Sequence, residues 1–482
     1  MIADLKPYPQ YREPEADWMG KIPIHWEVRR LKTVLHETDC RSRDGKGVLL
    51  SLTRNRGLIA RSDFTDKAQS AKTLVGYKIY EPNQIVMNRM QAWSGMFGLA
   101  QIAGLISPDY ASFEVLGNNN PKYLLSRIKS PDMVEQFALE SKGIGSGFNR
   151  LYSDRFGIIP VNLPPPDEQE AIVRFLDHAN RKIDRYVRTK KKLITLLNEQ
   201  KQAIIHRAVT RGLPSKSSGQ ATLDAPLKDS GIPWLGKIPE HWEVWRISRF
   251  AKVGNGSTPS RSNMSYWSGG TFPWLNSSHV NRGLIDSADQ YVTAAALRQC
   301  HLPKVSEGSV LVAITGQGKT RGTSAVLAFE ATINQHIAYI TPRLPIISAD
   351  FLHFSLVAAY STLRAISDDS GSTKGALTCE DLKRFKLAVP PLDEQATLVK
   401  DIVDATKATN TAINRAEHEV ELLNEYRTRL TADVVTGKLD VREAAANLPA
   451  FAEASAGEPT PEGSLEHTLP ELDEEELLEG VE

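Results

Sequence analysis

Apolar residues recur at helical spacing through a long, strongly charged stretch that begins near residue 163. Intervals of three, four or seven residues separate Ile172, Leu176, Ala179, Ile183, Tyr186, Leu193, Leu197 and Ile204. Lys190 and Gln200 occupy the two skipped places. A seam of this kind, sustained over about five heptads, predicts a helix that packs against another helix.

An internal repeat predicts the partner helix. The Pro-Pro-x-Asp-Glu-Gln sequence at 164–169 returns at 390–395, an offset of 226 residues. The same offset gives the second seam, in which Thr409 and Glu419 are polar: Leu398, Ile402, Ala405, Thr409, Ala412, Glu419, Leu423 and Leu430. The prolines suit an extended approach to each helix, and the acidic pair suits a first helical turn. We therefore expect helices over about 167–210 and 393–436 that pack against each other.

A second repeat opens each half of the chain. Trp-Met-Gly-Lys-Ile-Pro-Ile-His-Trp-Glu-Val at 18–28 returns as Trp-Leu-Gly-Lys-Ile-Pro-Glu-His-Trp-Glu-Val at 234–244, an offset of 216 residues. Because the two offsets differ, the segment between opening and helix differs in length between the copies. Glycine, proline and tryptophan at fixed places indicate a tight turn with stacked aromatic rings. We interpret each opening as a structural latch rather than a ligand site.

Each opening leads into a globular segment of mixed pattern, which we call a head. The first head, about 29–161, has β-prone runs at 47–52, 77–80, 84–87 and 97–102 and helical patterns at 121–130 and 132–141. The second, about 245–388, has strand patterns at 309–315, 323–329 and 337–341 and a helical pattern at 349–366. The heads do not align with each other. The sequence thus predicts two different α+β heads on duplicated supports.

Length, charge and cysteine usage limit the class of protein. A chain of 482 residues suggests two to four domains. It has no run of 18 apolar residues and no signal-peptide core. Three cysteines, Cys40, Cys300 and Cys379, lack metal-type spacing, which favours a reducing cytoplasm. Twelve acidic and no basic residues follow Arg442, so residues 1–442 hold 58 basic and 46 acidic residues. This basic body is compatible with nucleic acid as a partner.

Two polar segments should lack a core of their own. Residues 214–228 have the composition of a polar linker. Residues 440–482 are rich in alanine, proline and glutamate and end in Asp-Glu-Glu-Glu-Leu-Leu-Glu-Gly-Val-Glu. We expect this acidic tail to be mostly disordered.

One glycine-rich stretch partly matches a phosphate-binding loop. Residues 313–320, Ala-Ile-Thr-Gly-Gln-Gly-Lys-Thr, follow a predicted strand, as that motif requires. The motif also requires a following helix, whereas 321–327 indicates a turn and then a strand. We prefer a loop that presents Gln317, Lys319 and Arg321 to a groove, and keep a nucleotide-binding enzyme using Lys319 as an alternative. The sequence holds no motif for amine methylation, dinucleotide binding, zinc proteolysis or serine hydrolysis.

Polar loops in both heads mix basic, amide and hydroxyl side chains. Such side chains make bidentate contacts to base edges or reach phosphates. The candidate DNA-contacting residues of the first head are Arg54, Asn55, Arg56, Asn88, Arg89, Gln91, Lys142, Asn149 and Arg150. Those of the second head are Ser257, Thr258, Ser260, Arg261, Asn276, Ser278, His279, Gln317, Lys319, Arg321, Thr373 and Lys374. For any single residue, an ordinary solvated loop is the alternative.

The order of head, Pro–Asp-Glu-Gln helix, linker, second head and second helix resembles the specificity subunit of type I restriction–modification systems. The two Trp-x-Gly-Lys-Ile-Pro-x-His-Trp-Glu-Val openings carry this resemblance together with four shorter sequences. These are Met-Asn-Arg-Met-Gln-Ala-Trp-Ser-Gly at 87–95, Ile-Ser-Pro-Asp-Tyr at 106–110, Phe-Pro-Trp at 272–274 and Asn-Gln-His-Ile at 334–337. The resemblance extends to about Leu439, and the acidic tail is not part of it.

The resemblance implies an α+β fold in which two target recognition domains are separated by two long antiparallel coiled-coil helices, with a pseudo-twofold internal repeat. The implied segments are a first recognition domain at 1–163, a helical spacer at 164–213, a linker at 214–233, a second recognition domain at 234–389, a second spacer at 390–439 and the acidic tail at 440–482.

The resemblance also implies a cytoplasmic, non-catalytic subunit that binds double-stranded DNA. Each recognition domain would read half of a split, asymmetric site, and the helices would fix the unread gap. Two modification subunits would dock on the helices and methylate adenine with S-adenosylmethionine. Motor–nuclease subunits would complete the complex and consume ATP with Mg. This chain itself would bind no cofactor, metal or membrane. A coiled-coil scaffold with protein-binding heads is the remaining alternative.

Overall fold

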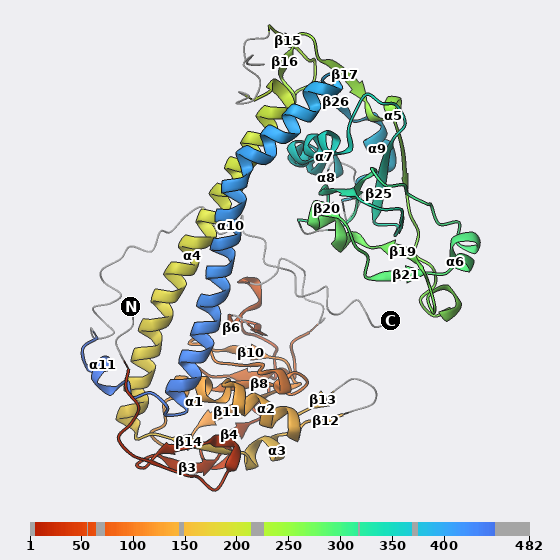
Figure 1. The fold of residues 1–482 in the computed structure, drawn as a ribbon. Coiled ribbons are helices and arrows are strands. Elements are labelled where there is room, and N and C mark those ends of the chain that lie inside the picture. The colour runs from red at the N-terminus through yellow and green to blue at the C-terminus, as the bar shows by residue number, and fades with distance from the viewer. Residues whose placement is uncertain are drawn as a thin grey trace. The chain divides into compact units, whose positions relative to one another are not determined.

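The computed structural model describes residues 5–54, 56–63, 73–143, 149–213, 226–316, 319–368 and 375–448. The chain forms two compact units (Figure 1). The first unit comprises the chain up to Lys190 together with the segment that begins at His418, and the second comprises Lys191–Glu417. Each unit therefore contains one head and a part of both long helices. None of the helices in the described ranges combines the length and apolar character needed to cross a membrane.

The two predicted long helices are present almost to the residue, as α4 (Pro166–Arg211) and α10 (Leu392–Val435). Within the first unit they pack antiparallel. Nζ of Lys190 lies 2.5 Å from Oε2 of Glu419, while Arg427 pairs with the earlier residue Asp184. Opposite charges across the seam thus fix the register of the two helices there.

The observed seam departs from the predicted one by a single residue in places. Ile183 is buried as predicted, but Tyr186 is 59% exposed and Val187 takes its place. In α10, Thr406 and Ile413 are buried where Ala405 and Ala412 were expected. Both helices contain two successive intervals of four between buried residues, at 179, 183 and 187 in α4 and at 398, 402 and 406 in α10. The predicted positions kept the strict alternation of three and four residues of a heptad seam and were wrong there, because an α-helix with about 3.6 residues per turn drifts from a 3.5-residue repeat.

In the first head, a four-stranded antiparallel sheet has the order β4-β11-β8-β9. Its strands are β4 (Leu35–Thr38), β11 (Tyr110–Val115), β8 (Ile85–Asn88) and β9 (Phe97–Gly98). Three helices contribute to the same core: α1 (Pro121–Ile128), α2 (Pro131–Glu140) and α3 (Ser153–Ile158). Two hairpin-like pairs lie beside the sheet, namely β5 (Leu50–Thr53) with β6 (Gly57–Ala60) and β7 (Lys78–Tyr80) with β10 (Gly104–Ile106). The predicted run at 97–102 forms only the short β9.

In the second head, the main sheet has five strands in the order β18-β25-β22-β23-β20. They are β18 (Ala251–Asn255), β25 (Ile337–Pro342), β22 (Val310–Ala313), β23 (Ser324–Leu327) and β20 (Leu284–Ile285). A smaller sheet contains β21 (Gln290–Val292), β19 (Phe272–Leu275) and β24 (Thr332–Ile333). The helix expected at 349–366 is two helices, α7 (Ala349–Ala358) and α8 (Tyr360–Asp368). The two heads are therefore both mixed, with different topologies.

Both heads close on the same strand pair, which sequence reasoning missed. In the first unit, β3 (Glu27–Arg30) follows the repeated opening and pairs antiparallel with β14 (Pro160–Leu163), the strand that leads into α4. In the second, β17 (Glu243–Arg246) pairs in the same way with β26 (Lys386–Val389), which leads into α10. The first and last strands of each head therefore meet beside the start of a long helix.

The linker and the tail contain more order than predicted. β15 (Leu227–Asp229), expected within the linker, pairs with β16 (Lys237–Pro239). After α10, α11 (Arg442–Ala446) packs into the core of the first unit through fully buried Val441 and Ala445. Val441 and Ala445 have the four-residue spacing of a buried helical face, but the alanine- and glutamate-rich composition led the segment to be assigned to the tail. Residues 214–225 and 449–482 lie outside the described part of the chain.

Candidate nucleic-acid interface

The repeated opening of the first unit docks on the first turn of α4. The buried carboxylate of Glu168 accepts hydrogen bonds from Tyr8 Oη at 2.6 Å and Trp26 Nε1 at 2.9 Å, and His25 Nε2 lies 2.8 Å away. Burial and the hydrogen bond to Glu168 raise the pKa of the Tyr8 phenol, so it remains a donor. The opening and the Asp-Glu-Gln sequence thus form one latch.

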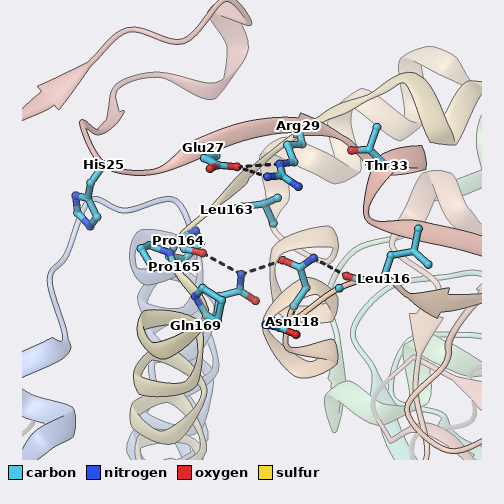
Figure 2. Close-up of a pocket in the computed structure, with 13 residues that line it drawn as sticks. His25, Glu27, Arg29, Thr33, Leu116, Asn118, Leu163, Pro164, Pro165 and Gln169 are labelled. Carbon is cyan, nitrogen blue, oxygen red and sulfur yellow. Dashed lines mark hydrogen bonds and ion pairs between the residues drawn. The ribbon is translucent and has the colours of Figure 1, made fainter.

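Gln169 extends the first latch to the head. Its Nε2 donates to the carbonyl of Pro164 at 2.9 Å, and its Oε1 accepts from the backbone N–H of Asn120 at 2.8 Å. Asn120 in turn caps α1. Figure 2 shows the polar cleft of about 380 Å³ beside these groups. Glu27 and Arg29 in its wall pair with each other at 2.7 Å, so their charges compensate each other.

The second unit repeats the latch with equivalent residues. Glu394 contacts His241 Nε2 at 2.9 Å and accepts from Trp242 Nε1 at 3.1 Å. Gln395 donates to the carbonyl of Pro390 at 2.8 Å and accepts from the N–H of Ser348, the N-cap of α7, at 2.8 Å. These contacts confirm that the two repeats are structural. Each head is held on its helix by the same set of bonds.

In the first head, the predicted loops gather near the end of β8. Arg54 Nη1 donates to the carbonyl of Ser94 at 3.2 Å, and the N–H of Leu151 donates to the carbonyl of Arg89 at 3.0 Å. Loops separated by many residues in the chain are thereby joined. Because β4 and β8 both run antiparallel to β11, their ends lie at one edge of the sheet.

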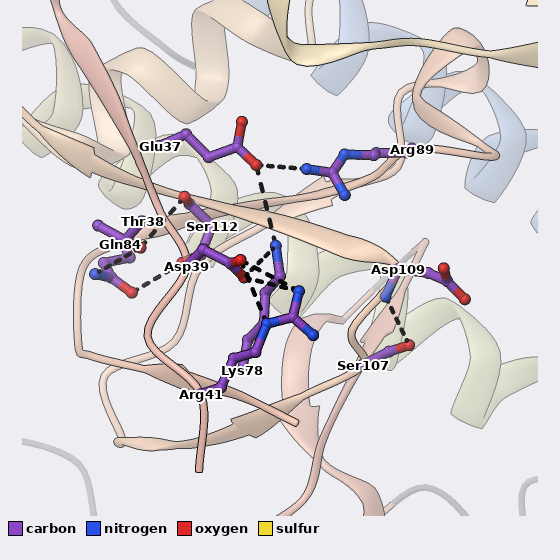
Figure 3. Close-up of polar contacts among 10 residues, drawn as sticks. All are labelled: Glu37, Thr38, Asp39, Arg41, Lys78, Gln84, Arg89, Ser107, Asp109 and Ser112. Atoms are coloured by element: carbon purple, nitrogen blue, oxygen red, sulfur yellow. Dashed lines mark hydrogen bonds and ion pairs between the residues drawn. The ribbon is translucent and has the colours of Figure 1, made fainter. Parts of the chain in front are cut away.

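Charged side chains form a network at this edge (Figure 3). Arg89 pairs with Glu37, and buried Lys78 lies 3.2 Å from Asp39 and 4.0 Å from Glu37. Burial would raise the pKa of Asp39, but hydrogen bonds from Arg41 and Lys78 outweigh it and lower the pKa overall. The carboxylate of Glu37 therefore compensates the charge of Arg89.

The other candidates of the first head have a variety of partners. Asn88 Nδ2 donates to Gln91 Oε1 at 3.0 Å, and Arg56 Nη1 donates to the carbonyl of Asp63 at 3.1 Å. The guanidinium of Arg150 lies 5.4 Å from the Tyr152 ring centroid. Two further candidates are exposed on a strand pair, Lys142 on β12 (Lys142–Gly143) and Asn149 on β13 (Asn149–Arg150). Asn55 lies outside the described residues.

In the second head, three polar loops meet at one edge of the five-stranded sheet. Ala313 at the end of β22 pairs with Ile337, and Asn255 at the end of β18 pairs with Ala338. The loops after β18 and β22 and the loop before β25 therefore lie together. Loops that follow the ends of strands in a rigid sheet are typical places for binding residues.

A chain of side-chain hydrogen bonds joins these loops. Thr258 Oγ1 donates to Gln335 Oε1 at 2.5 Å, Gln335 Nε2 lies 3.1 Å from His336 Nε2, and His336 Nδ1 lies 2.7 Å from Thr315 Oγ1. Gln335, His336 and Thr315 were not among the predicted contact residues. Asn-Gln-His at 334–336 was the available signal, and it was used only for the family resemblance.

Ser257, Ser260 and Arg261 lie on the loop after β18. Ser260 is exposed, and its Oγ lies 2.9 Å from the Oγ of Ser262. The exposed guanidinium of Arg261 stacks on an indole ring, 4.0 Å from the centroid of Trp267. The loop after β18 therefore presents both a hydroxyl and a guanidinium.

Several predicted contact residues of the second head have structural roles instead. His279 is 1% exposed, and burial lowers its pKa. Arg321 is also buried, where it binds the carbonyl of Gly375 and the carboxylate of Asp368. Asn276 accepts from the N–H of Ser278 at 3.1 Å and caps a short 3-10 helix. Their burial within the head contradicts the expectation that Arg321 is presented to a groove and that His279 is a DNA contact.

The glycine-rich loop after β22 does not continue into a helix. Exposed Lys319 and half-buried Thr320 form a turn, and β23 follows. The carbonyl of Lys319 accepts from Tyr360 Oη at 2.9 Å. A phosphate-binding loop needs a helix N-terminus at this place, so the geometry does not support nucleotide binding at Lys319. Gln317, Thr373 and Lys374 lie outside the described residues.

Comparison with known proteins shows which proteins the chain is similar to. A family model described as type I restriction modification DNA specificity domain matches residues 239–422. The chain is 28% identical over 330 residues to the MjaIX type I restriction enzyme specificity subunit of Methanocaldococcus jannaschii, covering 67% of this chain and 70% of that protein. The chain is thus similar to type I specificity subunits, and residues 239–422 match their DNA specificity domain.

A second relative matches a smaller part of the chain. The EcoR124I/EcoR124II specificity subunit of Escherichia coli is 24% identical over 254 residues, which are 51% of this chain and 63% of that protein. A solved chain from a study of complex assembly and conformational transition of the type I R-M system has a TM-score of 0.55 at 15% identity, covering 87% of this chain and 99% of that chain. That likeness shows the fold. Specificity subunits recognise DNA and are not themselves catalysts.

Proposed function

We propose that each head reads one half of a bipartite, asymmetric double-stranded DNA site and that α4 and α10 set the unread gap. One observation carries this proposal: equivalent latches, made by Glu168 in one unit and Glu394 in the other, hold heads of different topology. Each head gathers polar loops at one edge of its main sheet. Two different heads on repeated latches suit a DNA site whose two halves differ in sequence.

The proposed partners are two modification subunits on the helices and motor–nuclease subunits that complete the complex. Large apolar side chains on the helices of the first unit support a docking role. Tyr186, Leu422 and Tyr426 are exposed there, as apolar side chains that contact a partner protein would be in the free chain. In this proposal, the modification subunits bind S-adenosylmethionine and the motor–nuclease subunits use ATP and Mg, while this chain binds none of them.

An exchange of heads tests the division of labour. Residues 29–161 would be replaced by the equivalent segment of a relative with a different DNA site, and methylated adenines would be mapped in cells that carry the complex. We expect one half-site to change and the other to remain, because each head contacts only its own half. The reciprocal exchange of residues 245–388 is the matched control. A simultaneous change of both half-sites in either chimera would refute the two-reader proposal.

A further inference from the structure

Arg261 in the second head is both exposed and held in place. Its guanidinium carbon lies 4.0 Å from the ring centroid of Trp267 and 4.9 Å from that of Trp274. Its Nη2 donates to Oε1 of Gln290 at 2.8 Å. A long side chain on a surface loop usually samples many rotamers. Because these contacts already restrict Arg261 before binding, a partner loses less binding free energy to the conformational entropy of this side chain.

The loop that carries Arg261 is itself fixed by the same two indoles. Trp267 Nε1 donates to the carbonyl of Ser260 at 3.0 Å, and Trp274 Nε1 donates to the carbonyl of Ser257 at 3.3 Å. Thr258 lies between Ser257 and Ser260 in the sequence, and its hydroxyl donates a hydrogen bond to Gln335 on the loop before β25. The position of Arg261 relative to the polar edge of the five-stranded sheet is therefore fixed.

The charge of Arg261 is not compensated by a carboxylate among the described residues, since its polar partner is the neutral amide of Gln290. The carboxylate of the neighbouring Asp289 lies 3.2 Å from His279 and 3.3 Å from Arg282. Stacking covers a face of the guanidinium and leaves N–H donors at its edge. A planar fork of this kind matches two adjacent acceptors, as in guanine, phosphate or a carboxylate.

We propose that Arg261 reads a guanine in the half-site recognised by the second head, with Trp267 and Gln290 as positioning residues. Guanine presents O6 and N7 together in the major groove, and an arginine fork on these two acceptors is the commonest specific contact to a base. This inference rests on the proposed function, because it requires the second head to face DNA.

Stacking on tryptophan alone does not identify a base-reading residue. The second head has another stacked arginine with which Arg261 can be compared. Exposed Arg249 lies 4.1 Å from the ring centroid of Trp245. That pair stands on α5 (Ile247–Phe250) and β17, next to the latch. Arg261 stands among the loops at the polar edge of the sheet, which is the difference that assigns it to DNA.

The test uses the full complex and maps its methylated adenines. Arg261→Lys keeps the charge but loses the fork, so we expect discrimination for guanine at one position of the second half-site to fall roughly 10–100-fold. The first half-site should not change. Trp267→Leu should relax the same position, because it frees the arginine. Arg249→Lys, the matched control, should leave the motif intact. Melting temperatures of the variants exclude a folding defect.

Two outcomes would overturn the assignment while leaving the two-reader proposal intact. In the first, Arg261→Lys and Arg261→Gln both methylate the unchanged motif. In the second, Arg261→Gln weakens binding equally on all sequences and reduces the salt dependence, which would make Arg261 a phosphate contact. A change confined to the first half-site would instead contradict the proposed function itself.

Discussion

Glu168 and Glu394 occupy the same place in the internal repeat, yet they are held differently. Both contact the His-Trp pair of the opening in their own unit, but only Glu168 also receives a hydrogen bond from a tyrosine, Tyr8. The side chain of Glu168 is 4% exposed and that of Glu394 is 13% exposed. The latch residues alone do not determine how deeply the carboxylate is buried; the segments that cover the latch do.

The covering segments of the first latch come from both ends of the described chain. Tyr8 lies near the N-terminus, and the guanidinium of Arg442 lies 5.1 Å from its ring centroid. Lys6 and Asp440 form an isolated β-bridge beside them. The first latch therefore unites sequence from before the opening and after α10, which makes it the more buried of the two.

The heads differ in how they hold an arginine. Arg89 in the first head forms an ion pair with Glu37, whereas Arg261 in the second is held by two indoles and an amide. Both devices order the side chain. The ion pair also compensates its charge, which reduces what remains to attract phosphate. Both arginines are therefore ordered, but of the two only Arg261 keeps a positive charge that no carboxylate among the described residues compensates.

The largest effect is expected at the latches. Glu168→Ala leaves buried donors without an acceptor and should cost the first unit about 3–5 kcal/mol, because each unpaired buried donor costs about 1–3 kcal/mol. Glu394→Ala should cost the second unit about half as much, since fewer donors lose their partner and water reaches them. Hydrogen exchange resolved by segment measures both. Glu168→Gln, which keeps an acceptor, is the control, and equal losses in the two units would contradict this comparison.

An intermediate effect is expected from acid in the second unit. Burial, and then the positive charge of Lys201, lower the pKa of His353 to about 4 from an ordinary value of 6.5. The unfolded chain then binds a proton that the folded chain excludes, so stability is complete above pH 6.5 and falls toward pH 4. At pH 5 the loss should be about 1–2 kcal/mol.

The substitution His353→Gln isolates this contribution. An amide in place of the ring can still contact Ser324, whose Oγ lies 2.9 Å from His353 Nδ1, but it does not titrate. Hydrogen exchange can monitor unfolding of the second unit at pH values between 7 and 5. The free energy of unfolding should depend less steeply on pH in the variant than in the parent chain. If the variant keeps the slope of the parent chain, other groups cause the acid sensitivity.

The long helices and the latches were predictable from sequence because both occur twice in the chain. The helices and the latches follow from residues such as Glu168 and Glu394 that recur at constant offsets. The seam was less predictable, since Tyr186 continues the strict heptad alternation but is exposed, and the next residue, Val187, is buried instead. The period of about 3.6 residues per turn departs there from the 3.5-residue heptad repeat.

The binding edges were only partly predictable because side-chain direction depends on distant partners. Loops at strand ends could be identified, and the structure brings them together. His279 is enclosed by the head, and Arg321 is bound by Asp368 and Gly375, residues that sequence spacing does not connect with it. The indole pair around Arg261 likewise requires strand β19 to lie beside the loop after β18. Such neighbours arise from tertiary packing.

The smallest effect is expected when the partners of the two arginines, Glu37 beside Arg89 and Gln290 beside Arg261, are exchanged in charge. Glu37→Gln keeps an acceptor for Arg89 but removes the compensating charge, so DNA binding by the full complex should become about 2–5-fold tighter at low salt. Gln290→Glu does the reverse beside Arg261 and should weaken binding to a similar extent. The slope of log affinity against log salt should steepen by up to about 0.9 in the first variant and flatten by up to about 0.9 in the second.

The methylated sequence is the control for both variants. Glu37→Gln and Gln290→Glu each retain an oxygen acceptor at the arginine, so the bases read should not change while the salt dependence moves in opposite directions. Lys78 keeps Asp39 as its partner at 3.2 Å after loss of the Glu37 charge, which limits any effect on folding. If both variants shift the slope in the same direction, the change reflects the net charge of the complex and not these two arginines. If neither variant shifts it, their charges do not reach the phosphates, and the two ways of holding an arginine differ only in geometry.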